Sequence, residues 1–470
     1  MTIRTRFSPS PTGKMHLGNA RAALFSALYA TKNKGTFVLR IEDTDAERSE
    51  EIFMQNLQDD LHWLGLTWQE GPGVGGPYGP YLQSLRQDIY ANYYAIMAEK
   101  NVVYPCFCSD NELLLARKRL LARGLPPRYS GTCSALPAEE VEKRLAEGKK
   151  PALRYRVPEN QSVEFTDLVK GPQHFKTNDI GDFIIRRADG TSPFLFCNAV
   201  DDAMMKVNHI LRGEDHLSNT PRQLLLLKEL DLPLPQYGHL SLIVGEDGAK
   251  LSKRHGSSCV GDIRDTGFLP IAIMNYLTRL GHVCDSQELL DFDQLAPFFS
   301  LEKLSKSPAR FDMTQLMYWQ KCAVQKLDEE SLWRWLGVSV SGQVPEAQKA
   351  IFIETIKGNI EFPQDALIWA KIFFHDTVAL DETSTAAIQE AGEQFFVEAE
   401  NAVEKHGIDI KQVLAEMKST LGVSGKKLFM PLRAALTGRT DGPDMASIAT
   451  VIGQKKMQHR LSRAFKLSSE

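Results

Sequence analysis

Few features of this chain point to a membrane, a secretory route or an oxidising compartment. Seven cysteines in 470 residues are few and odd in number, which favours reduced thiols in the cytoplasm over a disulfide framework. No stretch reaches about eighteen uninterrupted apolar residues, so we expect no membrane span. The opening residues MTIRTRFSPSPTG lack the apolar core of a signal peptide. A net charge of -4 excludes a wholly basic nucleic-acid coat, although a local basic patch is enough to bind phosphates.

The N-terminal stretch has the pattern of a parallel α/β unit. After Gly18, alanine and leucine recur at helical spacing until Gly35, and TFVLRIEDTD (36–45) is then typical of a buried strand with a polar end. In such units ligands bind beyond the carboxyl ends of the strands. We therefore expect one crevice to contain these polar side chains: Ser8, Ser10, His16 and Glu42.

A chain of 470 residues with 43% hydrophobic content exceeds one ordinary core, so we expect about two to four domains. The stretch 70–84 is dense in glycine and proline and indicates a loop or a boundary. Residues from about 85 to 190 have the pattern of an insertion. It includes a charged helix near 110–123 and a strand at 151–157.

Strand character returns in SPFLFCNAVDD (192–202) and VNHILRGEDHL (207–217), where we expect the sheet to resume. Beyond about residue 310 the pattern changes to amphipathic helices. One of them is predicted to bury a single apolar face as part of a helical core. That face consists of Ile410, Val413, Leu414, Met417 and Leu421.

Two short motifs are weak alone and specific together. In HLGN (16–19), a glycine next to a histidine at a helix start is a candidate phosphate site, because helix N-terminal amides carry partial positive charge. A tight connection would explain the same glycine. In KLSKR (250–254), Lys250 and Lys253 lie in a glycine-flanked loop that is able to close over a polyphosphate. A solvated charged loop is the alternative.

The pair HLGN and KLSKR resembles the two signatures of class I aminoacyl-tRNA synthetases. More narrowly, the chain resembles the bacterial glutamyl-tRNA synthetases, and the matching stretches are spread over nearly its whole length. These stretches are RFSPSPTG, LRIEDTD, GGPYGPYLQS, NAVDD, LRGEDHLSNTPRQ, KLSKR and GKKLFMPLRAALTG.

The resemblance implies an α/β fold. It consists of a Rossmann-like parallel-sheet catalytic domain with an inserted acceptor-binding domain, followed by an all-α anticodon-binding half. The corresponding divisions are 1–84 and 191–245 for the two catalytic halves, 85–190 for the acceptor-stem insertion, 246–315 for the lysine loop and stem-contact region, and 316–380 and 381–470 for two helical anticodon-binding subdomains.

The resemblance also implies substrates and site residues. Glutamate, ATP with Mg²⁺, and tRNA-Glu would react in two steps, through a glutamyl-adenylate, on a cytoplasmic monomer. His16 and Lys253 would be catalytic. ATP would be held by His16, Gly18, Asn19, Asp215, Lys250 and Lys253. Glutamate would be held by Arg6, Ser8, Ser10, Glu42, Phe194, Asn198 and Arg212.

Two positions of the glutamate site leave alternatives open. Arg212 is the expected partner of the side-chain carboxylate, since its planar guanidinium suits bidentate contact. A structural arginine paired with Glu214 or Asp215 is the other interpretation. Phe194 departs from the tyrosine that many relatives carry, so one hydroxyl contact is missing.

A metal site is one of two interpretations of the cysteines in the insertion. Some relatives bind zinc through Cys-x-Cys and a later Cys-x-His, and here Cys106, Cys108 and Cys133 are present while Ala135 replaces the histidine. Tyr129 would supply an oxygen as the fourth ligand of a structural zinc. Buried thiols without metal are the alternative.

The resemblance implies that the C-terminal half reads the tRNA, and its segment 426–466 is locally basic in an acidic chain. Its helical pattern separates the chain from the glutaminyl and archaeal-type relatives, whose anticodon part is a β-barrel. A solvated helix face would explain the same charge. The basic residues of 426–466 are Lys426, Lys427, Arg433, Arg439, Lys455, Lys456, Arg460, Arg463 and Lys466.

Two other classes of function compete with a tRNA ligase. An enzyme that adenylates a small acid without tRNA would not need the long basic C-terminal half. A silent RNA-binding paralogue would not need an intact His16, Lys253 and Arg212. The choice between charging tRNA-Glu alone and charging tRNA-Gln as well stays open.

Overall fold

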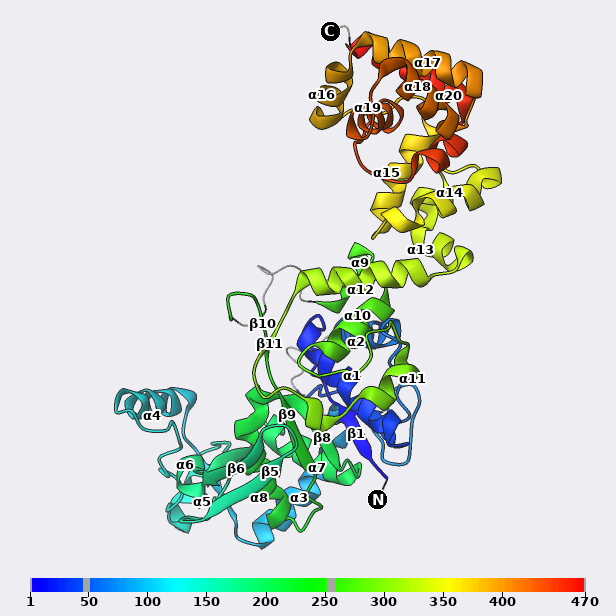
Figure 1. Cartoon of the computed structure of the whole chain (residues 1–470). Coiled ribbons are helices and arrows are strands. Elements are labelled where there is room, and N and C mark those ends of the chain that lie inside the picture. The colour runs from blue at the N-terminus through cyan, green and yellow to red at the C-terminus, as the bar shows by residue number, and fades with distance from the viewer. Residues whose placement is uncertain (1, 45–50, 250, 252–258, 469–470) are drawn as a thin grey trace. The chain divides into compact units, whose positions relative to one another are not determined.

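The computed structural model describes residues 2–44, 51–249, 251 and 259–468, and the chain divides into two compact units. The first unit runs to Asp265 and continues from Pro270 to Gln315. The second consists of Thr266–Leu269 and Leu316–Glu470. Figure 1 shows the elements of each unit.

The first unit is built on parallel strand pairs joined by helices, which confirms the predicted α/β class. Strand β1 (Arg4–Phe7) pairs with β2 (Thr36–Leu39) across helix α1 (Leu17–Lys32). Strand β8 (His209–Gly213) pairs with β9 (Gln236–Leu240) across α8 (Thr220–Glu229). The Asn208 amide donates to the Arg4 carbonyl at 3.1 Å. The green strands β8 and β9 therefore lie beside the blue β1 in Figure 1, although about 200 residues separate them in sequence.

The insertion lies between the two strand pairs. Its helix at 110–122 and its strand at 152–155 confirm the predicted elements, and the helix begins at a capping box of Ser109 and Glu112. The Leu168 amide donates to the Tyr237 carbonyl at 2.8 Å, which attaches the β5–β6 hairpin to β9. The elements are η1 (Gln83–Arg86), α3 (Gln87–Glu99), β3 (Val103–Cys106), α4 (Asp110–Ala122), α5 (Ala138–Ala146), β4 (Ala152–Tyr155), β5 (Ser162–Asp167), β6 (Gly171–Lys176), α6 (Thr177–Ile180) and β7 (Phe183–Arg186).

The strand predicted at 192–202 is wrong: these residues form helix α7 (Phe194–Met204), preceded by Pro193 in extended conformation. The helix is buried on several sides, including Phe196, Cys197 and Val200. A short apolar run that is buried all round has no helical periodicity to reveal it. The strand predicted at 207–217 is confirmed only for 209–213, because the 3-10 helix η2 (Glu214–Asn219) follows.

The other elements of the first unit pack around these strands. They are α2 (Glu51–Trp63), β10 (Ile243–Val244), α9 (Val260–Thr266, whose last residue belongs to the second unit), α10 (Pro270–Arg279), α11 (Phe292–Leu295), η4 (Ala296–Phe298), η5 (Leu301–Lys303) and β11 (Ala309–Arg310). Strands β10 and β11 pair in parallel. None of the described helices combines the length and hydropathy needed to cross a bilayer.

The described stretch 316–468 is entirely helical, as the change of pattern predicts. On α18 the predicted apolar face is confirmed, with Ile410, Val413 and Met417 buried and Leu414 and Leu421 half-buried. The helices, with α12 starting just before the boundary, are α12 (Met313–Lys326), α13 (Glu329–Ser341), η6 (Glu346–Gln348), α14 (Lys349–Ile356), η7 (Lys357–Asn359), α15 (Pro363–Phe374), α16 (Glu382–Ala391), α17 (Glu393–His406), α18 (Ile410–Leu421), α19 (Lys426–Thr437) and α20 (Met445–Ser468).

Some basic residues of the C-terminal segment serve the fold rather than the surface. Arg460 is only 2% exposed and donates to the carbonyls of Leu436, Ile372 and His375. Lys456 donates to two carbonyls at the end of α15. These two cations satisfy backbone acceptors that would otherwise be buried without donors, so charge counting overstates the basic surface.

Buried charges hold the centre of the first unit together. Arg40, which follows β2, is completely buried and donates to Asp202 of α7 at 2.7 Å and to Glu42 at 3.4 Å. Arg6 of β1 also reaches Asp202, at 3.4 Å. Burial raises the pKa of Asp202, but Arg40 and Arg6 outweigh it and hold that pKa below its ordinary value. Strands β1 and β2 and helix α7 are thus joined by paired charges.

We predict that Arg40→Met lowers the unfolding free energy of this unit by about 3–5 kcal/mol, because it takes the nearest cation from the buried carboxylate of Asp202 and leaves Glu42 without its paired guanidinium. The depressed pKa of Asp202 means that the pairing stabilises the fold above the ordinary aspartate range and that this contribution is lost as the pH falls. The difference in unfolding free energy between wild type and Arg40→Met should therefore become smaller at acidic pH. Urea unfolding at neutral and acidic pH measures both effects, with exposed Arg187→Met as the matched control. A deficit equal to that of the control, or one independent of pH, contradicts the assignment.

Candidate functional site

The residues predicted to hold ATP and glutamate, where the structure describes them, line one cavity of about 720 Å³. It opens at the carboxyl ends of β1, β2 and β8, as expected for a parallel α/β unit. The predicted residues that line it are Arg6, Ser8, Ser10, His16, Gly18, Asn19, Glu42, Phe194, Asn198, Arg212 and Asp215. The remaining two, Lys250 and Lys253, lie outside the described residues.

The start of α1 forms one wall of the cavity. His16 is exposed and is the residue before the helix, with an extended backbone (φ -83°, ψ 156°). Gly18 lies in the first helical turn, and its φ is not positive. A Cβ added there would meet no atom of the described chain within 4 Å. Neither a positive φ nor crowding by the described chain requires glycine at this position, and the open space beside it leaves room for a ligand near the helix N-terminus.

A carboxylate and an amide lie at the floor of the cavity. Asn198 of α7 donates to the Glu42 carboxylate at 2.5 Å, and Gln223 of α8 donates to the Asn198 carbonyl at 3.0 Å. Burial raises the pKa of Glu42, and Arg40 and Arg6 offset this only in part. Asn198 also reaches the Ser8 hydroxyl at 3.5 Å. The amide orientation is thereby set with its donors toward the carboxylate.

Arg212 of β8 has no counter-charge beside it. Its Nε donates to His239 at 3.2 Å and its Nη2 donates to Thr220 at 2.8 Å, while Nη1 has no hydrogen-bond partner among the described residues. Burial lowers the pKa of Arg212 to about 10. The interpretation of Arg212 as one partner of an ion pair is wrong within the described structure, because Glu214 pairs with Lys170 and Asp215 is exposed.

Several residues that shape the site escaped sequence reasoning. Arg40 had a local signal, since a charged residue inside an apolar strand must find a partner. Thr220 and Gln223 lie in the stretch LRGEDHLSNTPRQ (211–223), which matches the family, but nothing in it indicated their contacts. His239 and Asp167 had no signal, because their roles depend on strand pairing. In the structure, Arg212 lies directly opposite His239 in the β8–β9 pair.

Phe194 lies at the cavity wall, where its ring packs against the His216 ring with centroids 5.2 Å apart. Phe194 contributes only apolar atoms to this ring contact. The position predicted to lack a hydroxyl contact is therefore filled by ring packing.

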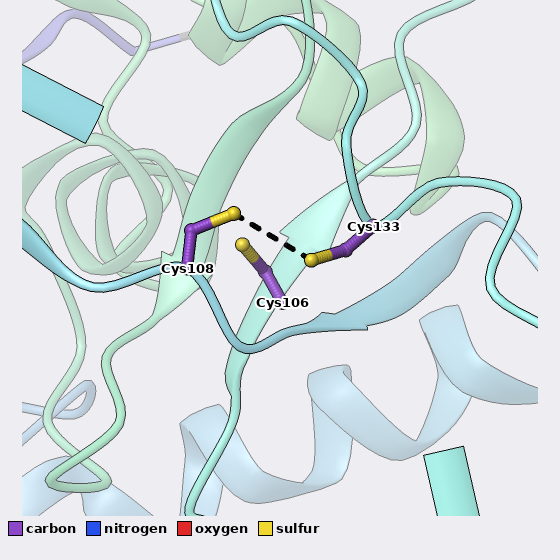
Figure 2. Close-up of side chains that lie close together, drawn as sticks. All are labelled: Cys106, Cys108 and Cys133. Carbon is purple, nitrogen blue, oxygen red and sulfur yellow. Dashed lines mark hydrogen bonds between the residues drawn. The ribbon is translucent and has the colours of Figure 1, made fainter. Parts of the chain in front are cut away.

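The thiols of Cys106, Cys108 and Cys133 point toward one another in the insertion (Figure 2), with their sulfurs all within 4.8 Å of one another. The Cys108 and Cys133 sulfurs are 3.6 Å apart, and the Tyr129 hydroxyl lies 3.3 Å from the Cys108 sulfur and 3.5 Å from the Cys106 sulfur. Zn–S bonds of about 2.3 Å at a tetrahedral centre separate two sulfurs by about 3.8 Å. The three thiols and the spacing of their sulfurs therefore fit zinc.

The cavity offers charges of both signs in a confined space. The guanidinium of Arg212 suits a carboxylate, the Glu42 carboxylate suits an ammonium group, and the N-terminus of α1 suits a phosphate. Such a cavity is able to hold an acidic amino acid next to a phosphate ester.

Comparison with known proteins gives consistent matches over the whole chain. Residues 2–318 match the family described as "tRNA synthetases class I (E and Q), catalytic domain", and residues 315–465 match "Anticodon binding domain". The chain is 52% identical to Glutamate–tRNA ligase 2 of Coxiella burnetii (strain RSA 331 / Henzerling II) over 462 residues, covering 98% of this chain and 99% of the relative. It is 53% identical to Glutamate–tRNA ligase 2 of Nitrosococcus oceani over 460 residues, covering 98% and 97%.

A solved structure is similar as well. The glutamate tRNA ligase from Elizabethkingia meningosepticum in complex with its amino acid superposes with a TM-score of 0.88 at 29% identity, covering 99% of both chains. The similarity thus extends through both units of this chain.

Proposed function

The chain belongs to the class I tRNA synthetases for glutamate and glutamine, and from that premise we propose that it is a glutamate–tRNA ligase. The observation that carries the choice of amino acid is the guanidinium of Arg212, which lines the cavity and forms no ion pair among the described residues. A ligand carboxylate would supply the missing counter-charge.

The reaction proceeds in two steps. An oxygen of the glutamate α-carboxylate attacks the α-phosphorus of ATP, and pyrophosphate leaves. A hydroxyl of the terminal tRNA adenosine then attacks the acyl carbon, and AMP leaves. The protein contributes positioning and charge stabilisation, and Mg²⁺ on the phosphates supplies further neutralisation.

We assign the nucleotide to the wall formed by α1. His16 would donate to phosphate oxygen, and the open side of Gly18 would let the nucleotide approach the helix N-terminus. Lys253 would stabilise charge on the departing pyrophosphate. The set proposed for ATP is His16, Gly18, Asn19, Asp215, Lys250 and Lys253.

We assign glutamate to the opposite part of the cavity. Arg212 would bind the side-chain carboxylate and Glu42 the ammonium group, with Asn198 holding Glu42 in place. The full proposed set is Arg6, Ser8, Ser10, Glu42, Phe194, Asn198 and Arg212. Since glutamate and glutamine are nearly isosteric, the pocket must separate them by charge. The amide NH₂ of glutamine would bring two donors against a guanidinium that has only donors.

The tRNA partner follows from the family and from the helical C-terminal unit. We propose tRNA-Glu, charged in the cytoplasm by a monomer, and leave tRNA-Gln as the second candidate substrate. Separate transcripts of the two tRNAs, assayed with labelled glutamate, decide between them. Glutamylation of tRNA-Glu supports the ligase, and glutamylation of both supports a non-discriminating enzyme. Activation of glutamate with no charging of either tRNA would refute the proposal.

For Arg212→Gln we expect kcat/KM for glutamate to fall by about 10²-fold or more, and the preference for glutamate over glutamine to narrow. The reason is that a neutral amide no longer compensates the side-chain carboxylate. Steady-state aminoacylation with both amino acids at matched tRNA measures the ratio, and Arg222→Gln, at an arginine outside the cavity lining, is the control. If a folded Arg212 variant kept the wild-type ratio of kcat/KM for glutamate to that for glutamine, the binding of the side-chain carboxylate would have to be assigned to Arg6.

We propose that zinc occupies the thiol cluster of the insertion and is held by Cys106, Cys108, Cys133 and Tyr129. The distances between the donor atoms support this assignment. Zinc would cross-link β3 to the loop that carries Tyr129 and Cys133, and would take no part in the transfer reaction.

The zinc assignment predicts about one zinc per chain in the purified protein and its loss in Cys108→Ser, with a lower unfolding temperature of the insertion. Elemental analysis and thermal unfolding with and without chelator measure the two effects. Cys322→Ser, at a cysteine in the other unit, is the control. Wild-type protein that contains no metal after preparation in zinc would contradict the assignment.

A further inference from the structure

A buried row of side chains continues from Arg212 away from the cavity. The Arg212 Nε donates to His239 Nε2 at 3.2 Å, and His239 Nδ1 lies 2.5 Å from an oxygen of Asp167. The side chains of His239 and Asp167 have no exposed surface. Neither residue is part of the described cavity lining, so any effect on a ligand has to pass through Arg212.

The partners of Asp167 fix which atom of its carboxylate faces the histidine. Oδ1 accepts from the backbone amides of Val169, Lys170 and His239 at 2.9, 2.8 and 3.2 Å. Oδ2 is therefore the atom left for the imidazole. Burial raises the pKa of Asp167, but the bonds from His239 and from these amides outweigh it and hold that pKa below its ordinary value.

These contacts also select the histidine tautomer. With an ionised carboxylate at Nδ1, the proton lies on Nδ1, and Nε2 accepts the Nε–H of Arg212. Burial lowers the pKa of His239, and the bond from Asp167 opposes this only in part, so the ring is neutral near pH 7. Thr220 completes the arrangement, since its hydroxyl lies 2.8 Å from Arg212 Nη2 and 3.0 Å from His239 Nε2.

We propose that Asp167 and His239 are positioning residues for substrate selection: the Asp167 carboxylate fixes the His239 tautomer, and His239 holds the Arg212 guanidinium at the cavity wall, in place to bind the side-chain carboxylate of glutamate. The inference rests on the proposed function. It also gives the β5–β6 hairpin of the insertion a role in the amino-acid pocket, because Asp167 is the last residue of β5.

The substitution Asp167→Asn tests this role while preserving shape. Three backbone amides would pin the new amide oxygen in the place of Oδ1, so its NH₂ would face His239. The histidine would then accept at Nδ1 and carry its proton on Nε2, and the Arg212 Nε–H would lose its acceptor. An unpaired buried donor weakens the hold on the guanidinium.

We expect Asp167→Asn to raise KM for glutamate by about 10-fold or more, with KM for ATP within about twofold and kcat changed less than KM, since the contact serves binding in ground and transition states alike. The matched control is Asp182→Asn, at another aspartate of the insertion that accepts from a backbone amide, here that of Val157 at 2.9 Å. It should leave both KM values within about twofold of wild type.

A double-mutant cycle with His239→Gln separates positioning from general damage. Glutamine carries an amide oxygen as many bonds from Cα as Nε2 and is able to accept from Arg212, but it has no tautomer for Asp167 to select. In the His239→Gln background, Asp167→Asn should therefore change KM for glutamate by no more than about twofold. A merely structural role of Asp167 would give the same loss in both backgrounds.

Steady-state aminoacylation of tRNA-Glu by wild type and the variants, with thermal unfolding alongside, provides all the readouts. The proposal is overturned if Asp167→Asn leaves KM for glutamate unchanged, raises both KM values equally, or shows the full loss in the His239→Gln background. If Asp167→Asn does not fold, His239→Gln must retain a lower KM for glutamate than His239→Asn, and equal values overturn the proposal. A wild-type protein that does not glutamylate tRNA-Glu would instead refute the proposed function.

Discussion

The guanidinium of Arg40 is completely buried, and the stability of the first unit depends on the carboxylates that neutralise its charge. Asp202 of α7 and Glu42 after β2 supply the carboxylates, and Arg6 of β1 shares Asp202. An isolated buried charge costs several kcal/mol, so the elements that carry these residues must come together for any of them to be stable. Since Glu42 and Arg6 also line the cavity, the same pairing that stabilises the fold sets the positions of two site residues.

Two buried arginines in this unit differ in what compensates them, and the difference separates structure from recognition. Carboxylates around Arg40 outweigh the effect of burial and raise its pKa above the ordinary value. Arg212 has a histidine and a threonine instead, and burial lowers its pKa to about 10. The charge of Arg40 is thus compensated within the fold. An under-compensated cation attracts an anion, and the cavity beside Arg212 admits one from solvent.

The insertion contributes side chains to two separate clusters. At one place three thiols converge (Figure 2) with a spacing that suits a structural metal, and the Tyr129 hydroxyl lies 3.3 Å from the Cys108 sulfur. At another, the β5–β6 hairpin lies against β9 and brings Asp167 to His239, directly behind Arg212. A segment that interrupts the α/β unit in sequence is therefore continuous with its core in space, because backbone hydrogen bonds extend across the join.

Sequence by itself determined the α/β class and the helical C-terminal half, because these depend on local periodicity. The ends of the predicted strands also indicated that Ser8, Ser10, His16 and Glu42 share one crevice, whereas the other predicted residues of the cavity came from the family resemblance. It misassigned α7, since a helix buried on several sides shows no polar face. It counted Arg460 among surface cations, although the tertiary structure places it against three buried carbonyls. Only the tertiary structure decided the surroundings of Arg212. The β8–β9 register places His239 opposite Arg212, the docking of α8 brings Thr220 to both, and the β5–β6 hairpin brings Asp167 to His239 from about 70 residues away in sequence.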